Sequence, residues 1–302
     1  MVDMQNIAET ELFRDVKTRI YDLVDKITSV DNVAIFATAD LEGIVSLAFL
    51  ESAMMDAKIS YSRKILPSIH NQSKGEGYNY SSTAKTVISI EQFEDTWKME
   101  EIDDHGRCRI LPLAVSVNHP NSVKQHNGAL DVVVQSAAIA SLISPNGIRV
   151  RRLRPLAGFG QWLRESLDNS YDPVYTKIRD SLQSEGTISI VPIPEIANPN
   201  TDMIPNFPDN MLRRLSKKWP KMDHEQRRQA MSELVLPVLL NPKISTPRLE
   251  ELLWFRIIVG EGVQDLHSQI HTAVTDWPVD ESEKKSHAGD ILKRLISTGG
   301  FE

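Results

Sequence analysis

Two acidic side chains stand one residue apart directly after an apolar run near the N-terminus. The run is Asn32 to Thr38, and the acids that follow it are Asp40 and Glu42, with Gly43 next. Carboxylate oxygens are the ligands that Mg²⁺ and Mn²⁺ prefer, so a metal site is one interpretation of this pair. The other interpretation is a helix start, in which Asp40 caps the first turn and the negative charge of Glu42 interacts favourably with the positive end of the helix dipole. Both interpretations place the acids where a strand ends and a helix begins.

The stretch around these acids resembles the first motif of the DHH phosphoesterase superfamily, which includes RecJ-type exonucleases. The motif there is His-x-Asp-x-Asp-Gly, followed by a helix rich in small and apolar residues, and this chain has Thr38-Ala39-Asp40-Leu41-Glu42-Gly43. Asp40 and Gly43 match the motif, whereas Thr38 replaces the metal-binding histidine and Glu42 replaces an aspartate. The resemblance covers residues 30–67 and extends more loosely to residue 145, and it implies a parallel-sheet domain.

Later motifs of the superfamily correspond less closely to this chain. Glu91 follows the apolar run Val87 to Ile90, where the resemblance implies a metal-binding acid. The Asp-His-His motif is matched only by Asp104 and His105, and a hydrophilic turn is the other interpretation of that stretch. The metal ligands implied by the resemblance are Asp40, Glu42, Glu91, Asp104 and His105. Because two-metal catalysis needs more ligands than these, we expect weak binding of Mg²⁺ or Mn²⁺, or no metal.

Positively charged side chains gather in two short stretches, although the chain carries a net charge of -7. The first stretch contains Arg149, Arg151, Arg152 and Arg154, and the second contains Arg213, Arg214, Lys217, Lys218 and Lys221 around Trp219. Cations beside an aromatic ring suit single-stranded nucleic acid, because phosphates meet the charge and a base stacks on the ring. A solvated helix face with a core-packed tryptophan is the alternative interpretation.

Hydrophobic periodicity predicts the elements that position these residues. Spacings of three and four predict helices at 8–29, 42–57 and 129–143, and continuous or β-rich apolar runs predict strands at 32–38, 58–62, 85–90 and 109–117. The order strand, helix, strand around Asp40 is typical of a parallel α/β sheet. Ligands bind such sheets at the carboxyl ends of the strands, so we expect Asp40 and Glu42 at that edge of a central sheet.

The second half of the chain is predicted to be mainly helical. Pro192 to Pro208 holds five prolines within 17 residues and marks the best candidate linker. Helices are predicted beyond it at 209–219, 224–240, 247–259 and 263–274. The predicted organisation is a DHH-like α/β domain over 1–195, a proline-rich linker over 196–208 and a helical region over 209–302.

Composition excludes several classes of protein. Hydrophobic residues make up 41% of the 302 residues and charged residues 25%, which is typical of a globular protein with a core. No apolar run is long enough for a membrane span, and the single cysteine, Cys108, excludes an intrachain disulfide and a multi-cysteine zinc site. The first residues lack the pattern of a secretory signal, so we expect a cytoplasmic protein without membrane contact.

Three functions are compatible with these patterns. The first is an inactive or weakly active DHH-like scaffold or single-stranded-DNA-binding component in DNA replication or repair. The resemblance implies this role because some members of the superfamily act as scaffolds in replicative helicases, beside GINS-like or helicase-like proteins. The second is an active Mn²⁺-dependent phosphoesterase or single-strand exonuclease. The third is an α/β interaction adaptor that does not contact nucleic acid.

Overall fold

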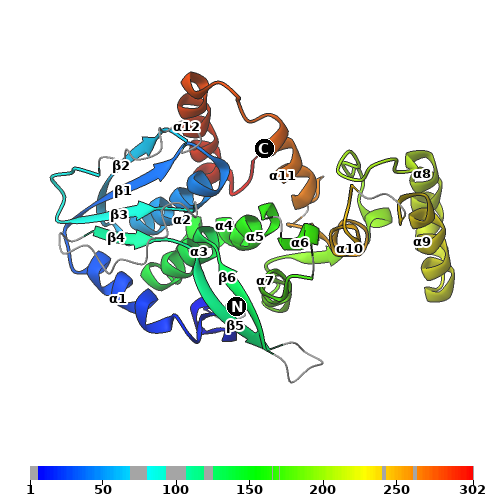
Figure 1. Cartoon of the computed structure of the whole chain (residues 1–302), viewed down its shortest axis with the longest axis horizontal. Coiled ribbons are helices and arrows are strands. Elements are labelled where there is room, and N and C mark those ends of the chain that lie inside the picture. The colour runs from blue at the N-terminus through cyan, green and yellow to red at the C-terminus, as the bar shows by residue number, and fades with distance from the viewer. Residues whose placement is uncertain are drawn as a thin grey trace. The chain divides into compact units, whose positions relative to one another are not determined.

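A four-stranded parallel sheet forms the centre of the N-terminal part of the chain (Figure 1). The structure, a computed structural model, describes residues 6–68, 80–92, 107–118, 125–164, 166–169, 171–239, 243–260 and 264–301. The strands are β1 (Asn32–Thr38), β2 (Ser60–Leu66), β3 (Thr86–Ile90) and β4 (Arg107–Ile110), in the order β2-β1-β3-β4. β1 is buried from its second residue onward because it lies between β2 and β3. The predicted α/β fold class with a parallel sheet is therefore confirmed.

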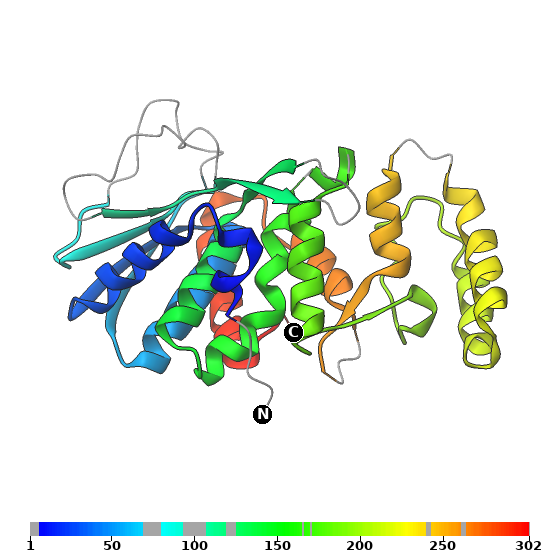
Figure 2. The same cartoon turned by 90° about the horizontal axis from the view of Figure 1, so that it is seen from below.

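Three helices cover one face of this sheet, as Figure 2 shows. They are α1 (Lys17–Thr28), α2 (Leu41–Ala57) and α3 (Val132–Ile143). α2 is buried almost all the way round, because it packs against β1, against α3 and against the C-terminal helix α12 (Glu281–Thr298). Its apolar sequence follows from this position, since a helix enclosed on several sides has little polar face.

Several predicted elements differ in the structure, among them the predicted helix 247–259, which ends at Trp254 and is followed by a short strand at Arg256–Ile258. The predicted helix 8–29 begins with two short 3-10 turns, η1 (Ile7–Glu9) and η2 (Glu11–Phe13), before α1. The predicted strand 109–117 is wrong as a single element, because it contains the end of β4 and most of β5 (Leu113–Asn118), which pairs with β6 (Gln125–Leu130) in an antiparallel hairpin. The helix predicted from residue 129 begins at Val132, because Asp131 accepts hydrogen bonds from the first turn and caps it.

The remaining elements are mostly short. They are α4 (Ile148–Leu153), η5 (Arg154–Gly158), α5 (Phe159–Leu163), α6 (Ser166–Asn169), α7 (Pro173–Ser184), β7 (Ser189–Val191), η6 (Ile193–Glu195), α8 (Asp209–Lys218), η7 (Trp219–Lys221), α9 (His224–Leu239), α10 (Thr246–Trp254), β8 (Arg256–Ile258) and α11 (Leu266–Thr275). In the described part of the chain, no helix combines the length and the apolar character needed to cross a membrane.

The chain divides into two compact units whose boundaries differ from the predicted ones. Unit 1 contains residues 1–163, 173–185 and 276–302, and unit 2 contains residues 164–172 and 186–275. The C-terminal helix α12 belongs to unit 1 because it packs against α2 and α4. The proline-rich stretch 196–208 lies within unit 2, where Ile196 and Ile204 are buried, and does not separate the two units.

Candidate functional site

Asp40 lies at the carboxyl end of β1, an interior strand, as the sequence predicted. It is the N-cap of α2, and its Oδ1 accepts a hydrogen bond from the backbone N–H of Gly43 at 2.9 Å. Glu42 occupies the first turn of the same helix and is half-buried. Both acids therefore have the positions that the helix-start interpretation requires.

Gln92, which the sequence analysis did not single out, holds the end of β1 to the end of β3. It is 6% exposed, and its Nε2 donates to Thr38 Oγ1 at 2.6 Å and to Asp40 Oδ2 at 2.5 Å. A carboxylate accepts hydrogen bonds and cannot donate them, so the group of Gln92 that faces Asp40 is the NH₂. The only available signal was that Gln92 follows a strand at the sheet edge where Asp40 lies.

Gly43 permits the close approach of α2 to the end of β1. A Cβ atom at this position would lie 2.6 Å from the carbonyl oxygen of Thr38 and 2.9 Å from its Oγ1. Distances this short do not occur for real side chains, so any larger residue would push the helix away from the strand. The glycine of the motif is explained by this packing.

Glu91 does not join Asp40 in a shared site. Its carboxylate is 5% exposed and accepts from Ser89 Oγ at 2.6 Å, from Arg107 at 3.3 Å and from Arg109 at 2.9 and 2.5 Å. The two guanidinium groups come from β4, the neighbouring strand, and they neutralise the carboxylate within the sheet. We therefore replace the predicted metal role of Glu91 by a structural one.

The described residues do not fit the metal that the resemblance implies. A hard divalent cation needs several oxygen ligands around one point, but an amide NH₂ faces Asp40 and two arginines face Glu91. Within the described ranges, no group of three or more His, Cys, Asp or Glu side chains could hold a metal ion. Asp104 and His105 lie outside the described residues.

The arginines of the first cluster all bind other residues of unit 1. Arg154 is 2% exposed and makes a two-pronged ion pair with Glu185, with both distances 2.9 Å. Arg149 pairs with Asp56 at 2.7 Å, Arg151 donates to Asn146, and Arg152 donates to the backbone carbonyl of Ser297. The predicted nucleic-acid role of this cluster is wrong for Arg154, because the buried side chain cannot reach a phosphate.

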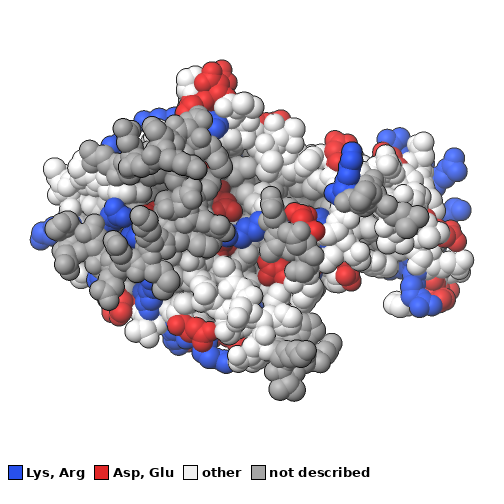
Figure 3. Space-filling view, in the orientation of Figure 1, with Lys and Arg blue, Asp and Glu red and all other residues white. Residues whose placement is uncertain are grey.

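The second cluster has the exposure that the sequence predicted. Its five cations, Arg213, Arg214, Lys217, Lys218 and Lys221, are all exposed on α8 and η7. Figure 3 shows Lys and Arg atoms on the surface of the region of α8 and α9, with some Asp and Glu atoms among them. Trp219 is 3% exposed, donates its Nε1–H to Glu195 at 2.8 Å and lies under the guanidinium of Arg227. The tryptophan is therefore part of the core and is not available to a nucleic-acid base.

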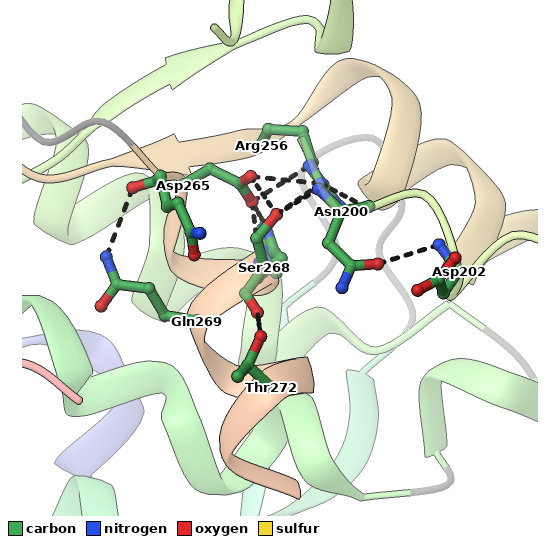
Figure 4. Close-up of polar contacts among 9 residues, drawn as sticks. Asn200, Asp202, Arg256, Asp265, Ser268, Gln269 and Thr272 are labelled. Atoms are coloured by element: carbon green, nitrogen blue, oxygen red, sulfur yellow. Dashed lines mark hydrogen bonds and ion pairs between the residues drawn. The ribbon is translucent and has the colours of Figure 1, made fainter. Parts of the chain in front are cut away.

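A second buried polar cluster, which the sequence analysis missed, lies in unit 2 (Figure 4). Arg256 on β8 and Asp265 before α11 are both fully buried, and two of their N–O distances are 3.1 Å. Ser268 donates to Asp265 at 2.5 Å, and Arg256 also donates to the carbonyl of Asn200 at 2.9 Å. The cluster joins a strand, a helix and the proline-rich stretch, so its role is structural.

Comparisons with known proteins identify no relative of this chain. No protein-family model matches the chain, and no curated protein matches it. The resemblance to the DHH superfamily therefore stays an expectation from the sequence, and the site has to be interpreted from its own contacts.

Proposed function

We propose that this protein is a non-catalytic α/β scaffold that binds nucleic acid through α8 in a DNA replication or repair assembly. The observation that carries the proposal is the set of five exposed cations on α8 and η7. None of these side chains makes an ion pair or hydrogen bond with another described residue. Unpaired cations on one face of an acidic protein create a local positive potential, and phosphates are the ligands that such a surface attracts.

The contacts of the Asp40 region support the non-catalytic part of the proposal. Asp40 caps a helix and accepts from Gln92, and Glu91 is neutralised by two arginines. A phosphoesterase needs carboxylates that are free to hold ions and activate water. The DHH resemblance supplies the scaffold role, the GINS-like or helicase-like partners and the link to replication. The cytoplasm belongs to the same proposal, because it keeps a free thiol such as that of Cys108 reduced.

An active Mn²⁺-dependent phosphoesterase or exonuclease is the second candidate. Asp40 favours it by position alone, since it lies at the carboxyl end of an interior strand, where α/β enzymes bind their substrates. The two candidates differ in one outcome: the scaffold binds an oligonucleotide and leaves it intact, whereas the enzyme shortens it.

The test uses the full chain with a fluorescein-labelled single-stranded oligonucleotide in Mn²⁺ buffer. Anisotropy measures binding, and a denaturing gel of the same samples measures cleavage. We expect salt-sensitive binding and an intact oligonucleotide for both the wild type and Asp40→Ala. Cleavage by the wild type that is lost in Asp40→Ala would replace the scaffold proposal by the phosphoesterase.

A triple charge reversal tests the surface. Lys217→Glu, Lys218→Glu and Lys221→Glu together should abolish binding and leave the fold intact, because all three side chains are exposed. The matched control reverses three exposed lysines of unit 1, at positions 26, 85 and 285, and should bind like the wild type. Equal affinity in both triple variants would overturn the assignment to α8, and no binding by the wild type at low salt would favour the adaptor without a nucleic-acid role.

A further inference from the structure

The cations of α8 occupy a broad arc of the helix and not a single line. At about 100° per residue, Arg213, Lys217, Arg214 and Lys218 lie at about 0°, 40°, 100° and 140° around the axis. The side chains that anchor the helix, Leu212 and Leu215, are buried and project from the opposite side. Arg213 and Lys218 therefore form the two margins of one exposed basic face, which we call the α8 face; Lys221 extends it into η7.

The acidic side chains near the α8 face do not neutralise its positive charge. Residues 209–228 contain seven Lys and Arg and three Asp and Glu, in a chain of net charge -7. Each acid has a contact elsewhere: Asp209 accepts from Thr201, Asp223 accepts from the backbone of Gln226, and Glu225 pairs with Arg228 at 2.7 Å. The arginines of α9 thus have acidic or aromatic partners, whereas those of α8 have none among the described residues.

Within α8 and η7, the only aromatic ring is that of Trp219, and it is not available to a stacking base. Trp219 is the only Phe, Tyr or Trp between residues 208 and 253, and it is buried under Arg227. Proteins that select single strands combine a basic groove with exposed aromatic rings, and each stacked base contributes about 1–3 kcal/mol. A face with cations alone recognises the phosphate backbone, which duplex DNA presents at about twice the charge density of one strand.

We propose that the α8 face binds double-stranded nucleic acid, with α8 lying in the major groove of a DNA duplex. The inference rests on the proposed function and replaces its single strand by a duplex as the preferred ligand. A helix with its side chains is about 10–12 Å wide, and the major groove is about 12 Å wide. In this position Arg213 faces the phosphates of one strand and Lys218 those of the other, because the two lie about 140° apart on the helix.

The salt dependence of binding tests this geometry. The probes are a short fluorescein-labelled duplex and its two separated strands, measured with the full chain between about 50 and 200 mM salt. With all five cations on phosphates, the slope of log K against log salt should approach about -4.5 for the duplex, a loss of about 500-fold over that range. We expect the duplex to bind more tightly than either strand at each salt concentration.

Two single variants at the margins give the sharper result. Arg213→Ala and Lys218→Ala should each reduce the duplex slope by about 0.9, because each margin releases one counterion from a different strand. Lys285→Ala on α12, which is also an exposed helix lysine, should leave the slope unchanged. Circular dichroism of all three variants should match the wild type, since none of these side chains is buried.

The outcomes separate the two proposals. Tighter binding to the single strands, or an effect of only one margin, would overturn the groove geometry and leave the proposed function standing. If neither the duplex nor the strands bind at the lowest salt concentration, both proposals fail.

Discussion

Removal of the Asp265 carboxylate is expected to destabilise unit 2 by about 3–5 kcal/mol. Arg256 and Asp265 are both fully buried, so Asp265→Ala leaves a guanidinium charge without an opposite charge. Among the described residues, the Asn200 carbonyl and the Ser268 hydroxyl would still accept from it, at 2.9 and 3.0 Å. Burial already lowers the pKa of Arg256, and the carboxylate opposes that shift. Its loss therefore exposes the full cost of desolvation.

A double variant, Arg256→Met with Asp265→Ser, should cost far less than the sum of the single variants Arg256→Met and Asp265→Ser. This double variant removes both charges and places a serine hydroxyl at residue 265, where it can cap α11 in place of the carboxylate that accepts from the Ser268 N–H at 3.1 Å. We expect this variant to lie within about 2 kcal/mol of the wild type, because replacing a whole buried ion pair is often close to neutral.

Urea unfolding followed by tryptophan fluorescence measures these costs, since Trp219 and Trp254 lie in unit 2 and Trp162 and Trp277 in unit 1. Hydrogen exchange locates the change: protection should fall in β8 and α11 of Asp265→Ala and stay unchanged in β1. A cost below about 1 kcal/mol for Asp265→Ala would refute the reasoning, as would a double variant that costs as much as Arg256→Met and Asp265→Ser added together.

Three further predictions concern unit 1. Gly43→Ala should lower the melting temperature by the equivalent of about 1–3 kcal/mol, because the new Cβ meets the Thr38 carbonyl at 2.6 Å; an unchanged melting temperature would contradict the close packing. Gln92→Leu should cost about 1–3 kcal/mol in urea titrations, since Asp40 and Thr38 lose a donor, and a neutral effect would show that water replaces it. Burial raises the pKa of Glu51 above its ordinary value of 4.5, so the protonated carboxyl stabilises the folded state, and this stability is lost as pH rises through the raised pKa. Glu51→Gln removes the titrating group, so its plot of unfolding free energy against pH should be flatter than that of the wild type above about pH 4.5 and not below it. Parallel plots for the two proteins would contradict this.

The sequence predicted the elements around Asp40 closely because their signals are local. β1 matches the predicted range, and α2 begins within one residue of the prediction, since a continuous apolar run and an N-cap acid are readable without tertiary contacts. The exposed α8 face was predictable for the same reason, because its cations and its buried leucines alternate with helical spacing.

Contacts between distant segments were not predictable in the same way. Gln92 meets Thr38 only because β3 pairs with β1, and the sequence does not show which strands are neighbours. Arg154 resembles its neighbours in the sequence, yet its ion pair with Glu185 is buried, whereas the side chain of Arg149 stays partly exposed in its pair with Asp56. The core-packed interpretation of Trp219 is confirmed, but its partner Glu195 was not predictable, since periodicity does not show which side chains surround a buried ring.

The discontinuity of unit 1 has a consequence for the order of events during synthesis. Residues 276–302 complete this unit, but residues 186–275 of unit 2 leave the ribosome first. At a synthesis rate of roughly 5–20 residues per second, the parallel sheet forms roughly 5–20 s before α12 is synthesised. During that time the apolar surface of α2 that α12 covers is exposed to solvent. Nascent chains that end before α12 should therefore attract chaperones that bind apolar surface, and release should follow the emergence of the last helix.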